Sequence, residues 1–377
     1  MAAVVSQLSS LGSRLLSCHA SHSSASLLLH RLTSPLLCAV SLAITAIRVF
    51  GDPIRCYTTG AMDIKFMEEY CWAMSTYSVE AATSTYPGLG LNQGRRSYHS
   101  HYQFLPLFLF LLAGACCLPM ALWRVWEGGL TSRLLPTTLD TLDWQKVRAY
   151  CGTIAAYFGR NQGSRHHGTF GRVFILTDIL CLATLLLVVG LLHLLLGDFL
   201  LYLPKYLEHL VGEGTEPGPE ERIFPLLTKC SYSTTGYSGS HQSIDALCIL
   251  GDNLFYRKAV LGVWAWLALA TTTCTFLVVL TALHLLPPLR RRRLSQLVAH
   301  RLDPLLVAAM ERSLTYGDWL VLTRLAGALP PDVASLLIET VANKLAARGE
   351  KLGGRRRKEL EKVGKGKNER RVPGRMF

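Results

Sequence analysis

Four of the eleven cysteines lie in two polar segments, and each segment separates two long apolar stretches of the chain. Cys56 and Cys71 lie in the first segment, and Cys230 and Cys248 lie in the second. Cysteines placed in this way form disulfide bonds where the compartment is oxidising, as it is outside the cell. Four thiols allow three pairings, and the sequence alone does not choose among them. The spacing therefore predicts a small, rigid, cysteine-bridged domain on one side of a membrane.

The composition is that of a chain that crosses a membrane several times. Of the 377 residues, 50% are hydrophobic and only 17% are charged, whereas a soluble domain carries about 25% charged residues. The apolar stretches predict four spans, each of which covers a hydrocarbon core of about 30 Å as a helix. Their predicted bounds are 32–50, 104–123, 173–203 and 259–286. The predicted fold class is an all-α membrane protein, a four-transmembrane-helix bundle subunit.

The basic residues are divided unequally among the segments outside the spans. Segments 1–31, 124–172 and 285–377 contain 29 of the 39 Lys and Arg residues, whereas loops 51–103 and 204–258 contain nine. Because basic loops remain in the cytosol, both termini and the middle loop are predicted to be cytosolic. The two cysteine-containing loops are then extracellular.

The cytosolic segments are predicted to fold in part. Apolar spacing over 287–348 is helical and, together with the loop 124–172, predicts a small helical cytosolic domain. Residues 349–377 contain eleven basic and four acidic residues, which is typical of a basic disordered tail. Contact of residues 355–358 with anionic lipid is the alternative. Aromatic residues are not interleaved with these charges, so nucleic acid is not an expected partner.

Enzyme motifs are absent from the sequence. It contains no Walker loop, no His-Glu-x-x-His motif and no Gly-x-Ser-x-Gly motif. His166 and His167 form a pair in the loop 124–172, but further ligands at the spacing of a zinc site are missing. We expect this pair to be exposed to solvent. The sequence predicts no catalytic residue, no metal site and no cofactor.

Several motifs, in order along the chain, resemble the innexins, which are the gap-junction proteins of invertebrates. The first loop carries Gly51-Asp52-Pro53-Ile54-Arg55-Cys56 and then Tyr70-Cys71-Trp72, and the second carries Thr228-Lys229-Cys230 and Asp245-Ala246-Leu247-Cys248. His101-Tyr102-Gln103-Phe104 is similar to the family's Tyr-Tyr-Gln-Trp motif, and Tyr316-Gly317-Asp318-Trp319 resembles part of its cytosolic tail domain. The resemblance covers about residues 30 to 345. Two cysteines per loop distinguish the chain from connexins, which carry three, although pannexins share the count of two.

The resemblance implies a gap-junction channel or hemichannel subunit in the plasma membrane that passes ions and small solutes between adjacent cells. It implies a homo-oligomer in membrane lipid, an octameric ring that docks to a ring on the neighbouring cell and that also accepts other innexins. The resemblance also implies disulfide bonds between Cys56 and Cys248 and between Cys71 and Cys230. The loop motif that it implies for docking consists of Gly51, Asp52, Pro53, Tyr70, Trp72, Tyr102 and Gln103.

A pore is expected at the axis of the ring, because one subunit with four spans cannot enclose a wide aqueous path alone. By resemblance, the pore is lined by the amino-terminal segment, the first span and part of the first loop. Rings of charged side chains then set ion selectivity. The candidates are Arg14 and Arg31 near the inner mouth and Arg48, Asp52 and Asp63 near the outer mouth. Anchoring at the membrane interface is an equal alternative for Arg48.

The chain also departs from the family pattern. Gly251-Asp252-Asn253 stands where the family has Pro-Leu-Asn after the last loop cysteine, and residues 1–31 lack the usual pattern. These departures leave two alternatives open: a non-junctional hemichannel that releases small molecules, and a non-conducting junctional adhesion or scaffold protein. Segment 1–31 is also rich in Ser and free of acidic residues, as mitochondrial transit peptides are. An organellar carrier is therefore a further alternative.

Overall fold

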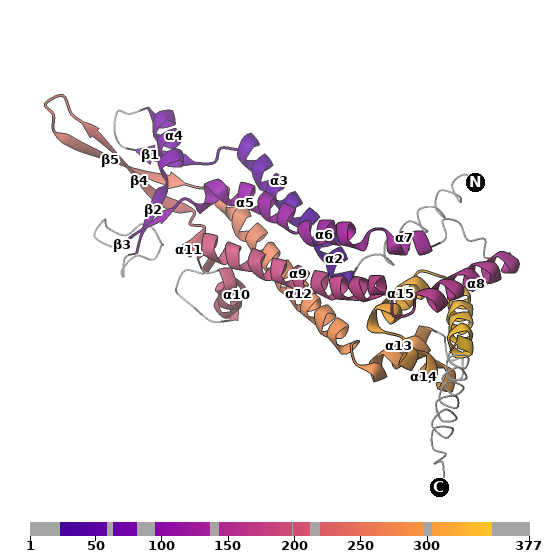
Figure 1. The fold of residues 1–377 in the computed structure, drawn as a ribbon. Coiled ribbons are helices and arrows are strands. Elements are labelled where there is room, and N and C mark those ends of the chain that lie inside the picture. The colour runs from indigo at the N-terminus through magenta and orange to yellow at the C-terminus, as the bar shows by residue number, and fades with distance from the viewer. Residues whose placement is uncertain are drawn as a thin grey trace, which may run out of the picture. The chain divides into compact units, whose positions relative to one another are not determined.

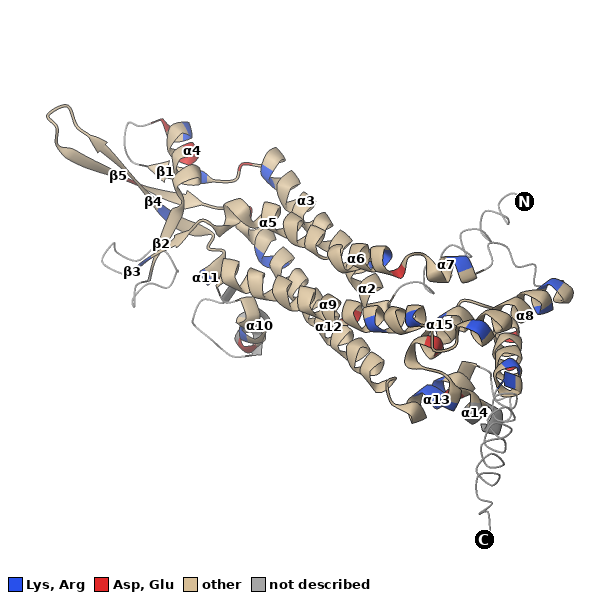
Figure 2. Cartoon of the chain, viewed as in Figure 1, with Lys and Arg blue, Asp and Glu red and all other residues tan. Residues whose placement is uncertain are grey.

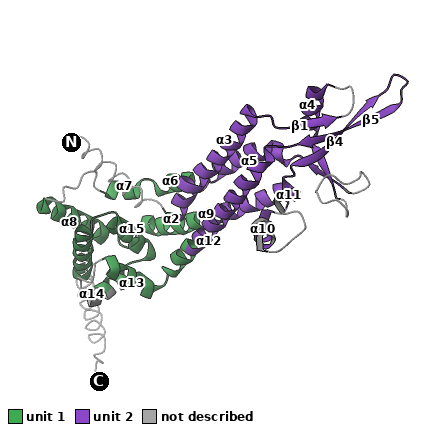
Figure 3. Cartoon of the chain, turned by 180° about the vertical axis from the view of Figure 1, so that it is seen from behind, with its two compact units in different colours: residues 1–24, 121–178, 277–377 green, residues 25–120, 179–276 purple. Residues whose placement is uncertain are grey.

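The structure is a computed structural model, and it describes residues 23–58, 63–80, 95–135, 143–197, 199–211, 219–297 and 304–348. The chain divides into two compact units, which Figure 3 shows in green and purple. Unit 1 consists of Met1–Ser24, Ala121–Asp178 and Leu277–Phe377, and unit 2 consists of Ala25–Met120 and Ile179–Phe276. Each unit is described by itself below.

Four helices are long and apolar enough to cross a membrane. Ser24–Phe50 contains α2 (Ser24–Leu27), the π-helical turn η1 (Leu28–Thr33) and α3 (Ser34–Phe50), and His101–Glu127 contains α5 (His101–Ala115) and α6 (Leu118–Glu127). The other two are α9 (Arg165–Leu196) and α12 (Asn253–Leu283), both labelled in Figure 1. These helices confirm the predicted four-helix membrane fold.

The first helix begins before the predicted span 32–50 and passes Pro35 without a break. Proline removes one backbone donor and crowds the turn that precedes it. Here Pro35 lies in the first turn of α3, directly after the wider turn η1, where the π-helical hydrogen-bond register already departs from the α-helical one. As a result Arg31, which lies in η1, is part of the helix and is exposed.

Unit 2 contains a five-stranded antiparallel sheet, which the apolar spacing of the sequence does not predict. Its order is β1-β5-β4-β2-β3. The strands are β1 (Arg55–Thr58), β2 (Thr76–Glu80), β3 (Arg95–His99), β4 (Leu227–Thr235) and β5 (His241–Ile249). The loops also contain four short helical segments: α4 (Ile64–Met74), η2 (Phe199–Leu201), α10 (Tyr202–Val211) and α11 (Pro219–Ile223). Because the two strands of the second loop lie between strands of the first loop in one sheet, the loops form a single folded domain.

The membrane helices of unit 2 pack through small and apolar side chains. Leu37 and Ile44 of α3 and Leu105 and Leu109 of α5 are buried. The hydroxyl of Ser41 donates a hydrogen bond of 2.7 Å to the Pro106 carbonyl. Other apolar side chains on these helices remain exposed on the single chain, among them Leu42, Leu107, Phe110, Leu111, Leu186, Leu187, Leu269 and Phe276. Such surface is compatible with lipid or with neighbouring copies of the chain.

Unit 1 is built from helices of the middle loop and the carboxy-terminal segment. They are α7 (Leu130–Leu134), α8 (Trp144–Asn161), α13 (Pro287–Leu297), α14 (Pro304–Ser313), α15 (Tyr316–Gly327) and a helix over 331–348. The fully buried side chains of Trp123, Phe158, Leu322, Leu337 and Ile338 belong to one core. The helices of the two segments therefore share one core.

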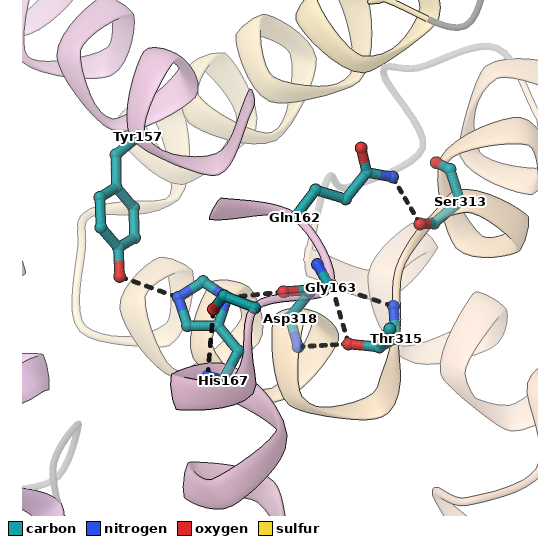
Figure 4. Close-up of polar contacts among 8 residues, drawn as sticks. Tyr157, Gln162, Gly163, His167, Ser313, Thr315 and Asp318 are labelled. Carbon is teal, nitrogen blue, oxygen red and sulfur yellow. Dashed lines mark hydrogen bonds and ion pairs between the residues drawn. The ribbon is translucent and has the colours of Figure 1, made fainter. Parts of the chain in front are cut away.

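The prediction that His166 and His167 are both exposed is wrong for His167. His166 is exposed, but His167, near the start of α9, has no exposed surface. Its Nδ1 lies 2.5 Å from Oδ1 of Asp318 on α15, and its Nε2 lies 2.8 Å from the hydroxyl oxygen of Tyr157 on α8 (Figure 4). The carboxylate partner lies 151 residues away in the sequence, so no local pattern reveals it.

Candidate functional site

Two disulfide bonds join the two loops of unit 2. Cys56 of β1 bonds to Cys248 of β5, directly opposite in the antiparallel register, with an S–S distance of 2.06 Å. Cys71 of α4 bonds to Cys230 of β4 with an S–S distance of 2.04 Å. This is the pairing that the family resemblance implies. Each disulfide closes a long segment of chain, which restricts the unfolded state and stabilises the loop domain.

The two disulfides are neighbours in the centre of the loop domain. The Sγ atoms of Cys56, Cys71 and Cys248 all lie within 4.8 Å of one another, and all four cysteines are buried. Since every one of these sulfurs is oxidised in a disulfide, they offer no thiolate to a metal ion. The described residues hold no other set of three His, Cys, Asp or Glu side chains with ligand atoms this close.

An arginine and a tryptophan fix the first loop to the ends of α3 and α5. The guanidinium carbon of Arg48 lies 4.6 Å from the ring centroid of Trp72, which is the geometry of a cation–π contact. Arg48 also donates a hydrogen bond of 2.8 Å to the carbonyl of Gln103, and the Gln103 side-chain amide donates to the carbonyl of Trp72. These contacts hold the Arg48 side chain against the first loop and the start of α5.

Three residues of the predicted docking motif have structural roles in the loop domain. Tyr102 has only 1% exposed surface, and its ring centroid lies 4.9 Å from that of Trp72. It therefore offers no surface to a partner in this structure. Tyr70 packs edge-on against Tyr232 of β4, with centroids 4.9 Å apart. Gly51 follows α3 so closely that a Cβ atom there would lie 2.7 Å from the Ile47 carbonyl oxygen, which explains the glycine.

The charged pore candidates have different surroundings. Asp52 is exposed and pairs with Arg55 at 2.8 Å. Asp63 caps α4, where its Oδ1 accepts a hydrogen bond of 3.1 Å from the backbone N–H of Lys65. Pro53 is half-buried beside Asp52. Arg14 lies outside the described residues.

Asp252, where the chain departs from the family pattern, is close to the charges of the first loop. Burial raises the pKa of its carboxyl, the positive charge of Arg48 opposes that rise, and the negative charge of Asp52 adds to it. The departure thus places an acidic group next to Arg48.

The hairpin of β4 and β5 extends beyond the rest of the sheet (Figure 1). The two strands pair with each other as far as Thr235 and His241. By contrast, β1 pairs with β5 only at residues 246–249, and β2 pairs with β4 only at Lys229. Tyr237, at the turn, is fully exposed. From residue 231 to residue 244 the sequence has no Asp, Glu, Lys or Arg, and it has nine Ser, Thr and Tyr residues. The hairpin tip (residues 231–244) is therefore an uncharged, hydroxyl-rich projection.

The hairpin tip is a feature that the sequence reasoning missed. Gly236 and Gly239 flank the turn, and Gly239 has a φ of +78°, which glycine adopts without strain. The backbone N–H of Gly236 donates to the Ser240 carbonyl at 2.8 Å and closes the turn. The Ser/Tyr/Thr run 231–235 and the run 240–249 on either side of Gly-x-x-Gly are a hairpin signal. That signal lies within this sequence and is sufficient to predict the turn.

Comparisons of the sequence with known proteins identify a family and its members. The innexin family model matches residues 23–345. "Innexin inx2" of Schistocerca americana is 28% identical over 331 residues, which cover 84% of this chain and 91% of that protein. "Innexin inx3" of Drosophila melanogaster is 26% identical over 332 residues, with 84% and 83% covered. "Innexin shaking-B" of the same species is 24% identical over 332 residues, with 84% and 88% covered.

Four membrane-length helices and a disulfide-bridged domain built from two loops define a membrane channel protein of the gap-junction class. The chain belongs to the innexin family. Innexins are subunits of gap-junction channels, which are oligomeric membrane assemblies, and the family is one of channels rather than enzymes.

Proposed function

We propose that the chain forms an octameric ring in the plasma membrane and docks, through its hairpin tip, to a ring on the neighbouring cell. The number eight is the one that the family resemblance implies, and mixed rings with other innexins follow from the same resemblance. Both termini and unit 1 are cytosolic in this proposal, since basic residues are concentrated in the segments 1–31, 124–172 and 285–377. The loop domain of unit 2 is then extracellular, which suits its disulfides.

The uncharged hairpin tip is the observation that carries the docking proposal. When two identical rings meet head to head, each tip approaches tips of the same sequence. A charged residue there would face like charges from the other ring, and like charges repel across an interface. Residues 231–244 avoid this repulsion and supply hydroxyl groups, which both donate and accept hydrogen bonds. Such a surface fits association with a copy of itself.

The pore proposal keeps the amino-terminal segment, the first helix and part of the first loop as the lining. Arg14 and Arg31 then form rings at the inner mouth, and Asp52 and Asp63 contribute near the outer mouth. Arg48 is held by Trp72 and Gln103 and acts mainly as an anchor. The two arginines of the acid-free segment 1–31 favour anions, so Arg14→Ser with Arg31→Ser is expected to shift the reversal potential in asymmetric salt towards cations.

Recording from paired cells that express the full chain tests the proposed function. Junctional current and dye transfer between two expressing cells are the expected result. Dye uptake by single cells without junctional current would instead identify a non-junctional hemichannel, and cell adhesion without either would identify a scaffold. Electron microscopy of the purified assembly counts the subunits. A ring of another number would refute the octamer and leave docking untouched.

A further inference from the structure

Helix α13 follows the fourth membrane helix after only three residues. Leu283, the last residue of α12, is 40% exposed, and Leu285 and Leu286 between the two helices are 46% and 50% exposed. At about 1.5 Å per residue, Leu283 lies about 38 Å along α12 from Lys258, and a bilayer with its headgroups is about 40–45 Å thick. If α12 crosses the bilayer from Lys258, the start of α13 lies at the headgroup layer, where exposed leucines are favourable.

The first turns of α13 carry four consecutive arginines, the basic turn (Arg290–Arg293), drawn in blue in Figure 2. The contacts of α13 with α14 and α15 determine which of these arginines face outward. Arg290 forms an ion pair of 3.0 Å with Glu311, both side chains being nearly buried. Its carbonyl accepts a hydrogen bond of 3.3 Å from the Trp319 indole, and Leu294, one turn later, has no exposed surface. Since residues advance 100° each around a helix, Arg292 points away from this packed face.

Two arginines of the basic turn, Arg292 and Arg293, present their positive charge on its outward part. Arg291, Arg292 and Arg293 are exposed, and α13 contains no acidic residue. Glu311 is already engaged with Arg290. Burial lowers the pKa of Arg324 on α15, Asp178 opposes this shift, and the positive charge of Arg293 adds to it. Arg293 thus stands near a second arginine, so an anion that approaches this surface lowers the repulsion between them.

We propose that Arg292 and Arg293, together with the exposed Leu285 and Leu286, form a binding surface for anionic lipid. The leucines enter the interface and the arginines contact headgroup phosphates and carboxylates. Consecutive arginines fan out around a helix and cannot converge on one headgroup, so the surface selects negative charge rather than a particular lipid. That the lipid belongs to the cytoplasmic leaflet rests on the proposed topology. Basic residues at a membrane surface contribute ~1 kcal/mol each, which is about a fivefold change in affinity.

Titration of the full-length protein with phosphatidylserine, in mixed micelles with a neutral detergent, tests the proposal. Arg292→Gln with Arg293→Gln is expected to raise the apparent dissociation constant about thirtyfold, which corresponds to ~1 kcal/mol for each arginine. The matched control is Arg148→Gln with Arg348→Gln, which removes the same charge from exposed positions on helices that do not follow a span. This control is expected to bind as the wild type does. Arg292→Lys with Arg293→Lys is expected to retain binding, because charge rather than bidentate geometry is required.

Three results would overturn the proposal. Equal loss in the two glutamine variants would mean that net charge alone attracts the lipid. Unchanged binding in Arg292→Gln with Arg293→Gln would exclude this surface. Loss of the oligomer in that variant, with lipid affinity retained, would assign the basic turn to a contact between subunits. The titration uses no cell pair, so its outcome is independent of whether the channel docks.

Discussion

Nδ1 of His167 lies 2.5 Å from Oδ1 of Asp318, and neither side chain has exposed surface. The other carboxylate oxygen accepts hydrogen bonds from the Thr315 hydroxyl at 2.7 Å and from the Gly163 backbone N–H at 2.9 Å (Figure 4). One carboxylate therefore joins the start of α9, the preceding turn and the start of α15. A buried carboxylate is tolerated only when its lone pairs are satisfied in this way.

The first prediction concerns the charge of Asp318. Burial raises the pKa of its carboxyl, but hydrogen bonds from His167, Thr315 and Gly163 lower it more, so the net pKa is below its usual value. A group with a depressed pKa stabilises the fold above its unfolded pKa of about 3.9 and loses that effect as the pH falls through the folded value. Asp318→Asn is expected to cost about 3 kcal/mol at pH 7, since it breaks a buried pair.

Thermal unfolding of the purified protein at pH 7 and pH 3 measures this effect. The Asp318→Asn variant should unfold at a lower temperature than the wild type at pH 7, and the gap should narrow at pH 3. Glu339→Gln, at an exposed position of the helix 331–348, is the matched control and should leave both temperatures unchanged. Equal stability of Asp318→Asn and wild type at pH 7 would contradict the structural role of the carboxylate.

The second prediction concerns Gly317, next to Asp318. A Cβ atom at Gly317 would lie 2.0 Å from the backbone carbonyl oxygen of His167, and backbone cannot move aside as a flexible side chain can. Gly317→Ala is therefore expected to destabilise unit 1 by about 1–3 kcal/mol, as overpacking does. Gly152→Ala on α8 is the control: it meets nothing within 4 Å and should be neutral or stabilising by up to about 1 kcal/mol. Limited proteolysis and thermal unfolding compare the two variants.

Local features of the sequence predict the membrane helices well, but they do not reveal contacts between distant residues. A run of about 20 apolar residues identifies a span without knowledge of any partner. The disulfide Cys56–Cys248 joins residues 192 apart, and only the family resemblance implies it. The burial of His167 depends on Asp318, 151 residues away. The strand β1 has only four residues, too few for a periodic signal, and it forms because β5 pairs with it.

The third prediction is a pH dependence of the loop domain. His99 of β3 is buried, and its Nε2 lies 2.8 Å from the Ser78 hydroxyl oxygen. Burial, and then the neighbouring His101, lower the pKa of His99 to about 4. The unfolded chain, with a pKa of about 6.5, binds the proton more readily, so stability is full above pH 6.5 and falls as the pH drops from 6.5 to 4. The expected loss over this range is about 3 kcal/mol.

Unfolding temperatures measured between pH 7 and pH 4 check this dependence. His99→Gln removes the titrating group while it keeps a partner for Ser78, so its curve should be flatter than that of the wild type. His241→Gln, at an exposed position on β5, should reproduce the wild-type curve. A wild-type slope that persists in His99→Gln would assign the pH dependence to another group.

The fourth prediction compares the loss of a disulfide with the loss of free cysteines, by their effect on junctional current. A single Cys230→Ser change leaves Cys71 as a free thiol, whose Sγ lies within 4.8 Å of the Cys56 and Cys248 sulfurs and can attack that disulfide. The double change Cys71→Ser with Cys230→Ser avoids this exchange. It is expected to cost about 2–5 kcal/mol and to abolish junctional current. Cys38→Ser with Cys117→Ser, which removes two free cysteines of the membrane helices, should retain the current. Normal coupling by the Cys71→Ser, Cys230→Ser variant would show that docking does not need this bridge.

The last prediction tests docking through the hairpin tip by charge. Tyr237 is fully exposed at the turn, so its replacement leaves the core of unit 2 unchanged. Tyr237→Lys in both cells of a pair places like charges opposite each other and should abolish junctional current, and Tyr237→Asp in both cells should do the same. One cell with Tyr237→Lys and the other with Tyr237→Asp should recover the current, because the opposed charges then attract.

Currents of single cells should be equal in all cases, which controls for assembly. Tyr57→Lys and Tyr57→Asp, at an exposed position on β1, which pairs with residues 246–249 outside the hairpin tip, form the matched pair and should not show this pattern of loss and recovery. Loss of current in the Lys–Asp pair, with single-cell currents intact, would mean that Tyr237 does not face the opposite ring.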